Sequence, residues 1–170
     1  MSRALGVLGF AVSTQQFGMV YLEGGELMDW KRSSRASKSF EAAFKLALKW
    51  ILYYRPDMVV VEAIAENTRK GARTRSLVLA VESAADNANV AHTSVPQSFA
   101  AANKYDHAAE LARAFPQLAG RLPAPRRKWE REPHNIVFFE ALSLALTWLR
   151  RHPHDREIGL SEAPTSGRLE

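Results

Sequence analysis

The run Met58-Val59-Val60-Val61 constrains the fold more than any other feature of the sequence. These four apolar residues, three of them β-branched, follow Arg55-Pro56-Asp57 and stop at Glu62. Such a run predicts a short strand that is buried on both faces, as in a parallel or mixed sheet. Because burying an unpaired charge is costly, Glu62 is expected where the strand emerges into a cleft, where ligands of open α/β sheets gather. The alternative is that Glu62 only marks a solvated strand end.

The segments before this strand predict an antiparallel meander followed by a helix. Apolar runs give three strands, over residues 5–12, 17–22 and 27–30, and Gly24-Gly25 is a hairpin signal between the last two. From Ser37 to Tyr54, apolar residues recur at steps of three and four, which predicts an amphipathic helix capped by Ser37 or Ser39. This helix leads back to the strand at 58–62, which should therefore lie parallel to the first strand.

The rest of the chain alternates between helices and strands. The predicted elements are a helix over 74–87, a strand over 90–95, a helical turn over 96–102, a helix over 104–115, a loop over 116–127 and a helix over 132–150 with Pro133 in its first turn. The fold class is therefore α/β, with one mixed five-stranded sheet and helices on both faces. Residues 1–151 form one domain, and residues 152–170 are a polar tail expected to be disordered.

Composition narrows the classes of function. The chain has no cysteine, which excludes disulfides and thiolate metal sites. No apolar run approaches the roughly 18 residues that span a bilayer, and Met1-Ser2-Arg3-Ala4 has no signal-peptide design. We therefore expect a cytoplasmic protein with no membrane partner.

The positive charge favours a polyanionic partner. The formal net charge is +5 and the sequence pI is about 9.7. Basic residues gather in two clusters, the second of which ends at an aromatic residue; the clusters are Arg69, Lys70, Arg73 and Arg75, and Arg126, Arg127, Lys128 and Trp129. Basic side chains beside an aromatic ring suit phosphate contacts and base stacking, so both clusters are candidates for binding nucleic acid. The alternative is an ordinary solvated surface.

The order of elements, together with several motifs, resembles the RNase H-like fold of the RuvC-type Holliday junction resolvases. It is similar above all to a less studied bacterial family of RuvC-like proteins. The resemblance covers about residues 4–150 and rests on motifs in the same order, namely Val7–Ala11 with Gly18, Arg55–Asp57 leading to Glu62, Lys104-Tyr105-Asp106, and Leu122–Trp129 followed by Glu132 and Phe139–Leu142.

The resemblance implies a metal-dependent nuclease site. In such nucleases, acids from the first strand, the fourth strand and the last helix hold two Mg²⁺ ions that activate water. Glu62 matches the fourth-strand acid, and Glu140 matches a last-helix acid where the family usually has Asp. Glu132 matches an acid that is frequent in the more similar family, and its spacing of eight from Glu140 would place both on one helix face. The implied catalytic residues are Glu62, Glu140 and Glu132, with Glu62 and Glu140 as ligands of Mg²⁺ or Mn²⁺.

Two positions depart from the pattern of these resolvases. Ala11 stands where the first strand should carry the Asp that bridges both metals, and Val137 stands where a second last-helix acid is expected. Neither side chain offers an oxygen ligand. The set that remains would bind one metal weakly or none.

Three functions follow as hypotheses. The first is a nucleic-acid-binding protein that recognises branched or otherwise structured DNA, with nuclease activity lost or weakened. The second is an active Mg²⁺- or Mn²⁺-dependent endonuclease that uses Glu62, Glu140 and Glu132. The third is a protein-interaction scaffold on the same fold. A homodimer is expected in each case, with the apolar last helix as a possible interface.

Overall fold

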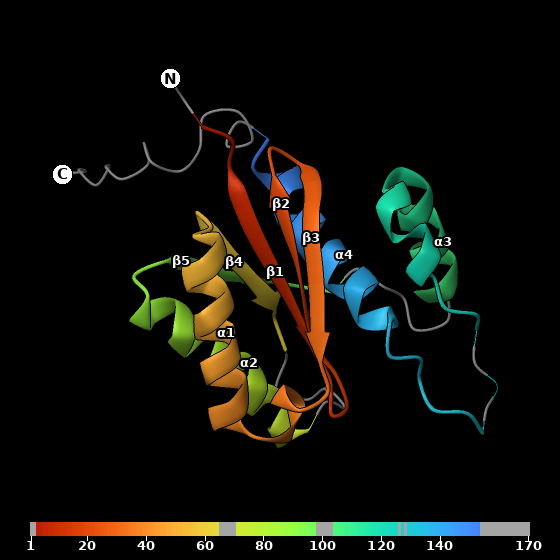
Figure 1. Cartoon of the computed structure of the whole chain (residues 1–170), viewed down its shortest axis with the longest axis horizontal. Coiled ribbons are helices and arrows are strands. Elements are labelled where there is room, and N and C mark those ends of the chain that lie inside the picture. Colours follow the sequence, from red (N-terminus) through yellow and green to blue (C-terminus); the bar gives the residue numbers. More distant parts are fainter. Residues whose placement is uncertain (1–2, 65–70, 98–103, 126, 128, 154–170) are drawn as a thin grey trace.

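A computed structural model describes residues 3–64, 71–97, 104–125, 127 and 129–153. These residues form one five-stranded sheet with the strand order β3-β2-β1-β4-β5 (Figure 1). The strands are β1 (Gly6–Val12), β2 (Phe17–Glu23), β3 (Glu26–Ser33), β4 (Met58–Glu62) and β5 (Ala91–Val95). The first three pair antiparallel, while β4 pairs parallel with both β1 and β5. The predicted meander, crossover and mixed sheet are therefore confirmed.

Helices cover both faces of this sheet. They are α1 (Phe40–Tyr54), α2 (Ala72–Asn87), α3 (Lys104–Ala114) and α4 (Ile136–Arg151), with short 3-10 helices η1 (Ala36–Lys38) and η3 (Pro116–Arg121). Ser39 caps α1 as predicted, because its side chain accepts a hydrogen bond of 3.1 Å from the Ala42 N–H. The first two helices lie on one side of the sheet, and α4 lies on the other with α3 outside it (Figure 1).

Two predicted elements differ from the structure near the C-terminal helix. The segment predicted as a loop over 116–127 contains η3, which starts at Pro116 and buries Leu118. The last helix begins at Ile136 with Asn135 as its N-cap, and not at Glu132. Pro133 explains why Glu132 is outside the helix, since a proline disfavours helical backbone at the residue before it. Of the helical turn predicted over 96–102 and the tail predicted over 152–170, residues 98–102 and 154–170 lie outside the described residues, and residues 96 and 97 are not helical.

The alternation of side chains along each strand divides the core into two layers. Along β1, Val7 and Ala11 face the α4 side, while Leu8, Phe10 and Val12 face α1 and α2. On the second side, the rings of Phe10 and Phe17 stack on Trp50 with centroid separations of 6.1 and 5.8 Å, and the two phenylalanine rings are tilted to each other at 5.7 Å. Side chains therefore fill both layers of the core.

The C-terminal helix lies unusually close to the sheet. A Cβ added to Gly9 would lie 2.7 Å from the Ala141 carbonyl oxygen, so only a glycine fits between β1 and α4. Twelve of the sixteen residues of α4 are buried. The apolar surface that the sequence offered as a dimer interface is thus covered within the protomer. Within the described part of the chain, no helix is long and apolar enough to cross a membrane.

Candidate functional site

The site expected from the sequence would lie where β1 and β4 run side by side. Their parallel register pairs Val7 with Met58 and Gly9 with Val60. Two residues further along both strands stand Ala11 and Glu62. Ala11 belongs to the core under α4, and alternation along β4 places Glu62 on the same side, because Met58 and Val60 also face that core. Ala11 and Glu62 thus follow the paired residues at the same ends of the two strands.

Apolar packing fills the space beside Ala11. Ala11 pairs with Gly18 of β2, and Val137 of α4 packs onto that glycine: a Cβ added to Gly18 would meet Val137 Cγ1 at 2.7 Å. Ala11 is 3% exposed and Val137 is 1% exposed. A carboxylate at either position would therefore have to be buried against hydrocarbon, which is costly for a charged group.

Glu132 and Glu140 come together around a lysine. The Lys104 Nζ, at the first residue of α3, donates a hydrogen bond to Glu132 Oε2 and lies 3.8 Å from Glu140 Oε2. The three side chains are largely buried, with exposed fractions of 21% for Lys104, 31% for Glu132 and 19% for Glu140. Burial lowers the pKa of Lys104, but the hydrogen bond to Glu132 and the charge of Glu140 outweigh it, and the pKa is raised. The Lys104 side chain is therefore positively charged at neutral pH.

A cavity of about 320 Å³ opens beside this cluster. It is lined by the β1–β2 turn, the segment before α4 and the first turns of α4, that is by residues 13–16, 129–133, 136, 137 and 140. Trp129 stands at its rim with 78% of its surface exposed, and the Arg127 guanidinium lies 5.7 Å from the centre of its ring. This combination offers a stacking surface and a positive charge at the entrance of the cavity.

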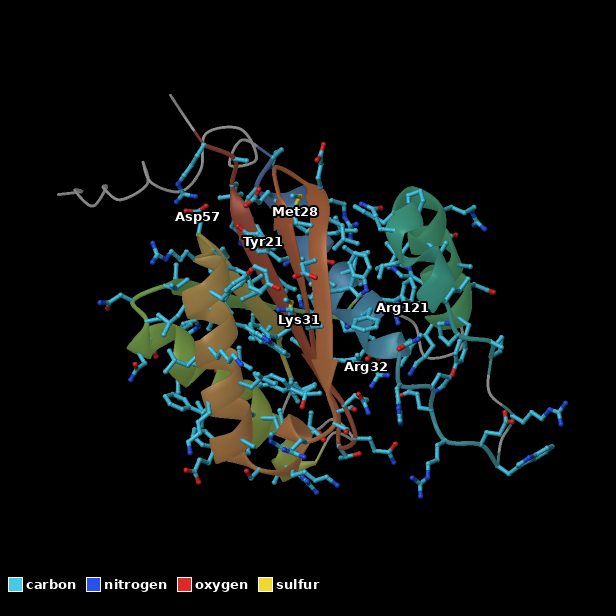
Figure 2. The ribbon with its side chains drawn as sticks, in the orientation of Figure 1. Tyr21, Met28, Lys31, Arg32, Asp57 and Arg121 are labelled. Atoms are coloured by element: carbon cyan, nitrogen blue, oxygen red, sulfur yellow. The ribbon has the colours of Figure 1, made fainter. Side chains whose placement is uncertain are left out.

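Arg32 holds one wall of the cavity in place. It lies at the end of β3 (Figure 2). Its guanidinium group donates hydrogen bonds to Asn135 Oδ1 at 3.1 Å and to Gln16 Oε1 at 3.3 Å. The β1–β2 turn is further fixed by Ser13, whose Oγ accepts from the Gln16 N–H at 3.0 Å. The turn and the start of α4 are thus tied to each other through one arginine.

Glu62 lines a different cavity. That cavity, of about 420 Å³, lies against α2 and is lined by Glu62, Ala63, Ile64, Arg75, Val78, Leu79, Glu82 and Ser94. Glu62 is half-buried at the end of β4 and is absent from the lining of the cavity of Glu132 and Glu140. The structure therefore brings together two of the three predicted carboxylates and leaves Glu62 beside a basic residue, Arg75.

The residues present do not fit the two-metal centre that the resemblance implies. In the described ranges, no three His, Cys, Asp or Glu side chains lie close enough together to hold a metal ion. Mg²⁺ needs hard oxygen ligands, and Ala11 and Val137 supply none. Glu132 and Glu140 already share an ammonium group. The prediction that Glu132 shares a helix face with Glu140 is also wrong, since Glu132 precedes α4; Lys104 brings them together instead.

The predicted basic clusters are only partly described. Arg73 donates to the carbonyl oxygens of Ser37 and Lys38, each at 3.0 Å, so it ties α2 to η1. Arg75 lines the cavity of Glu62, and Arg127 stands over Trp129. The other predicted phosphate contacts lie outside the described residues, namely Arg69, Lys70, Arg126 and Lys128.

Sequence reasoning missed two groups of residues at the site. Lys104 entered only as part of a motif, and the polar turn from Ser13 to Gln16 was taken as a connection. The only sequence signal for Lys104 was its place at a helix start, next to an aromatic and an acidic residue. This signal is weak, because the carboxylates that Lys104 contacts lie 28 and 36 positions further along the chain. The turn follows directly after β1, so its place at the carboxyl end of that strand was the usable signal.

Comparison with solved structures identifies the fold. The RuvC of Thermus thermophilus aligns with a TM-score of 0.56 and 18% identity over 88% of this chain and 97% of that chain. The fowlpox virus resolvase, in complex with Holliday junction DNA, aligns with a TM-score of 0.59 and 10% identity over 87% and 99%. The yeast mitochondrial Holliday junction resolvase aligns with a TM-score of 0.50 and 10% identity over 91% and 85%.

These likenesses show the fold, and the RuvC-type, RNase H-like architecture expected from the sequence is confirmed. No protein-family model matches the sequence, and no curated protein matches it.

Proposed function

We propose, with this shared fold as the premise, that the chain binds branched or otherwise structured DNA and that its nuclease activity is lost or weakened. The observation that carries the proposal is the apolar packing of Ala11 and Val137 around Gly18, at positions where nucleases of this fold would need carboxylates. The chain has the fold of these nucleases, but apolar residues stand at two positions where metal-binding carboxylates would be expected. A DNA-binding role without cleavage accounts for both facts.

The face around Trp129 supports the binding part of the proposal. An exposed indole stacks on an unpaired base whatever its sequence, and alanine substitution of such a ring costs about 1–3 kcal/mol per base. Arg127 lies beside the ring, and Arg131 lines the adjoining cavity. Both guanidinium groups are suited to phosphate contacts. An unpaired base at a junction would thus find a ring to stack on, with cations for its flanking phosphates.

Two resolved neighbours of the same fold support DNA as the partner. The Thermus thermophilus RuvC and the fowlpox virus resolvase were each solved with a Holliday junction. A four-way junction interrupts base stacking at its centre when its arms are unstacked, which leaves base faces that an aromatic side chain can cover. A homodimer and a cytoplasmic location stay predictions from the sequence, and so does Mg²⁺ or Mn²⁺ as cofactor of any residual activity.

A binding titration tests this function. Fluorescence anisotropy would compare a four-way junction, a duplex and a single strand of matched length at low salt and at rising salt. We expect the junction to bind most tightly and the logarithm of its affinity to fall linearly with the logarithm of salt concentration, because phosphate contacts release counterions. Failure to bind any of the three at low salt would contradict the proposal.

The endonuclease hypothesis makes a separate prediction for the same substrates. It requires junction cleavage with Mg²⁺ or Mn²⁺ that Glu62→Ala abolishes. Cleavage of this kind would show that Glu62 still acts as a metal ligand with the two remaining acids. Because Ala11 and Val137 offer no oxygen ligand, we expect the junction to stay intact instead.

A further inference from the structure

In the cluster of Lys104, Glu132 and Glu140, two carboxylates surround one positive charge, as they would around a bound cation. Here the positive charge is the ammonium group of a lysine. Two carboxylates from different segments converge on one positive centre, which hydrogen-bonds to one of them and lies 3.8 Å from the other. All three side chains are mostly shielded from solvent. Removing one partner from such a shielded group leaves the other charges uncompensated, which is strongly unfavourable.

The place of this cluster in the fold adds a second observation. Glu140 projects from the same helix as Val137, one turn away, and Val137 packs beside Ala11. The helix that brings carboxylates to the metal centre in the resembled nucleases thus brings one here, but its partner is an ammonium group from α3. The cluster therefore lies next to the position where the missing acids would have stood.

We propose that Lys104 is a built-in replacement for a divalent cation: it neutralises Glu132 and Glu140 and fastens the start of α3 to the start of α4. A divalent ion and this ammonium group compete for the same two carboxylates. Lysine carries its charge at the end of a flexible stem as a compact point charge, so it suits such a position better than the planar arginine group. Divalent cations are thereby kept from this cluster in the native chain.

The packing of α3 explains what the fastening does. Helix α3 reaches the core through Ala108, Leu111 and Ala112, and Tyr105 of its first turn packs against the same core. The first turn of α3 is therefore held by Tyr105 and by the lysine with its two carboxylates. Losing the ammonium group should loosen this turn and at the same time free two carboxylates to bind an added cation.

The test compares Lys104→Met with wild type in thermal unfolding, with and without millimolar MnCl₂. Methionine is unbranched and only one heavy atom shorter than lysine, and it removes the charge. We expect wild type to show no Mn²⁺-dependent change in Tm. The Tm of Lys104→Met should fall by several degrees without metal and recover in part with Mn²⁺. Electron paramagnetic resonance of free Mn²⁺ should show binding by the variant and none by wild type.

A matched control separates this effect from the loss of any lysine. Lys45 forms an ion pair of 3.2 Å with Glu41, and both side chains are more than 70% exposed. Lys45→Met should leave Tm and Mn²⁺ binding unchanged, since exposed pairs of this kind contribute little. Mn²⁺ binding by wild type, or a Lys104→Met variant whose Tm is unchanged or indifferent to Mn²⁺, would overturn the proposal.

A third variant covers the case in which Lys104→Met does not fold. In Lys104→Met/Glu132→Gln/Glu140→Gln the three charges of the cluster are removed together, so no member of the cluster keeps a charge without its counter-charge. This variant should fold and should show no Mn²⁺ response. Failure of the triple variant to fold would also overturn the proposal. None of these measurements involves DNA, so their outcome is independent of the proposed function.

Discussion

Val137 and Gly18 fit together so closely that no atom can be added between them. The Cβ that an alanine would bring to Gly18 meets Val137 Cγ1 at 2.7 Å and Cγ2 at 3.0 Å. Since Gly18 is the register partner of Ala11, this contact closes the sheet surface beside Ala11. The packing of one helix on two strands therefore leaves no room for a side chain at Gly18.

Gly18→Ala should destabilise the fold by about 1–3 kcal/mol, because the new methyl group overpacks a closed contact. Trimming the opposing side chain makes room, so in Gly18→Ala/Val137→Ala the total loss should be smaller than the sum of the single losses. Urea unfolding of the four proteins gives this coupling energy. Gly120→Ala is the control, since a Cβ there meets nothing within 4 Å. Strictly additive losses would show that the two residues do not press on each other.

Trp129→Ala should weaken binding to a four-way junction by about 1–3 kcal/mol, which is roughly 5- to 150-fold in Kd. The loss comes from the stacking surface, so the salt dependence of binding should change little. Anisotropy titrations measure both. Tyr53→Ala is a matched control, because this aromatic is 72% exposed but lies on α1, across the sheet. Equal losses in the two variants would argue against a binding site at Trp129.

Asp57→Ala should cost more stability than Arg3→Ala, although the two residues form one ion pair. The Asp57 side chain is 6% exposed and also accepts a hydrogen bond of 2.8 Å from the Gly6 N–H at the start of β1. Its loss leaves the Gly6 N–H without this acceptor, which should lower the free energy of unfolding by about 1–3 kcal/mol. The Arg3 side chain is 60% exposed, so its pairing contributes at most about 1 kcal/mol. Chemical unfolding ranks the two, and the reverse order would contradict this account.

Stability should fall at alkaline pH through two tyrosines. Burial raises the pKa of Tyr21 and of Tyr54, and hydrogen bonds to Glu23 and Asp29 raise them further. The unfolded chain then loses these protons first, so the contribution is complete below about pH 10 and is lost as pH rises through the raised pKa values. In Tyr54→Phe, the free energy of unfolding measured in urea should fall less steeply between about pH 9.5 and pH 11 than in wild type. An unchanged slope in that variant would remove Tyr54 from the explanation.

Much of the fold could be predicted because its signals are local. The run from Met58 to Val61 is apolar at every position since both faces of β4 are covered, by α4 on one side and by α1 and α2 on the other. The cap at Ser39 and the Gly24-Gly25 hairpin follow from backbone chemistry that neighbouring residues decide. That Ala11 stands where the resembled nucleases carry an acid was an expectation from the lead-in Val7–Phe10.

The site itself depends on contacts that spacing does not encode. The step of four from Glu132 through Ile136 to Glu140 suggested one helix face, but Pro133 and Asn135 start the helix later. The two carboxylates still meet, because Lys104 approaches from another helix. No local pattern specifies that approach, which depends on how α3 docks on α4. In the same way, Arg73 belonged to a basic cluster in sequence and is bonded to two carbonyl groups in the fold.

The most direct test of binding without cleavage is one gel experiment on a labelled four-way junction. The protein, at a concentration that saturates binding in a native gel, is incubated with the junction in Mg²⁺ or Mn²⁺, and the strands are then separated under denaturing conditions. The account predicts a shifted junction in the native gel and strands of full length in the denaturing gel. Cut strands that appear with wild type and disappear with Glu62→Ala would contradict it.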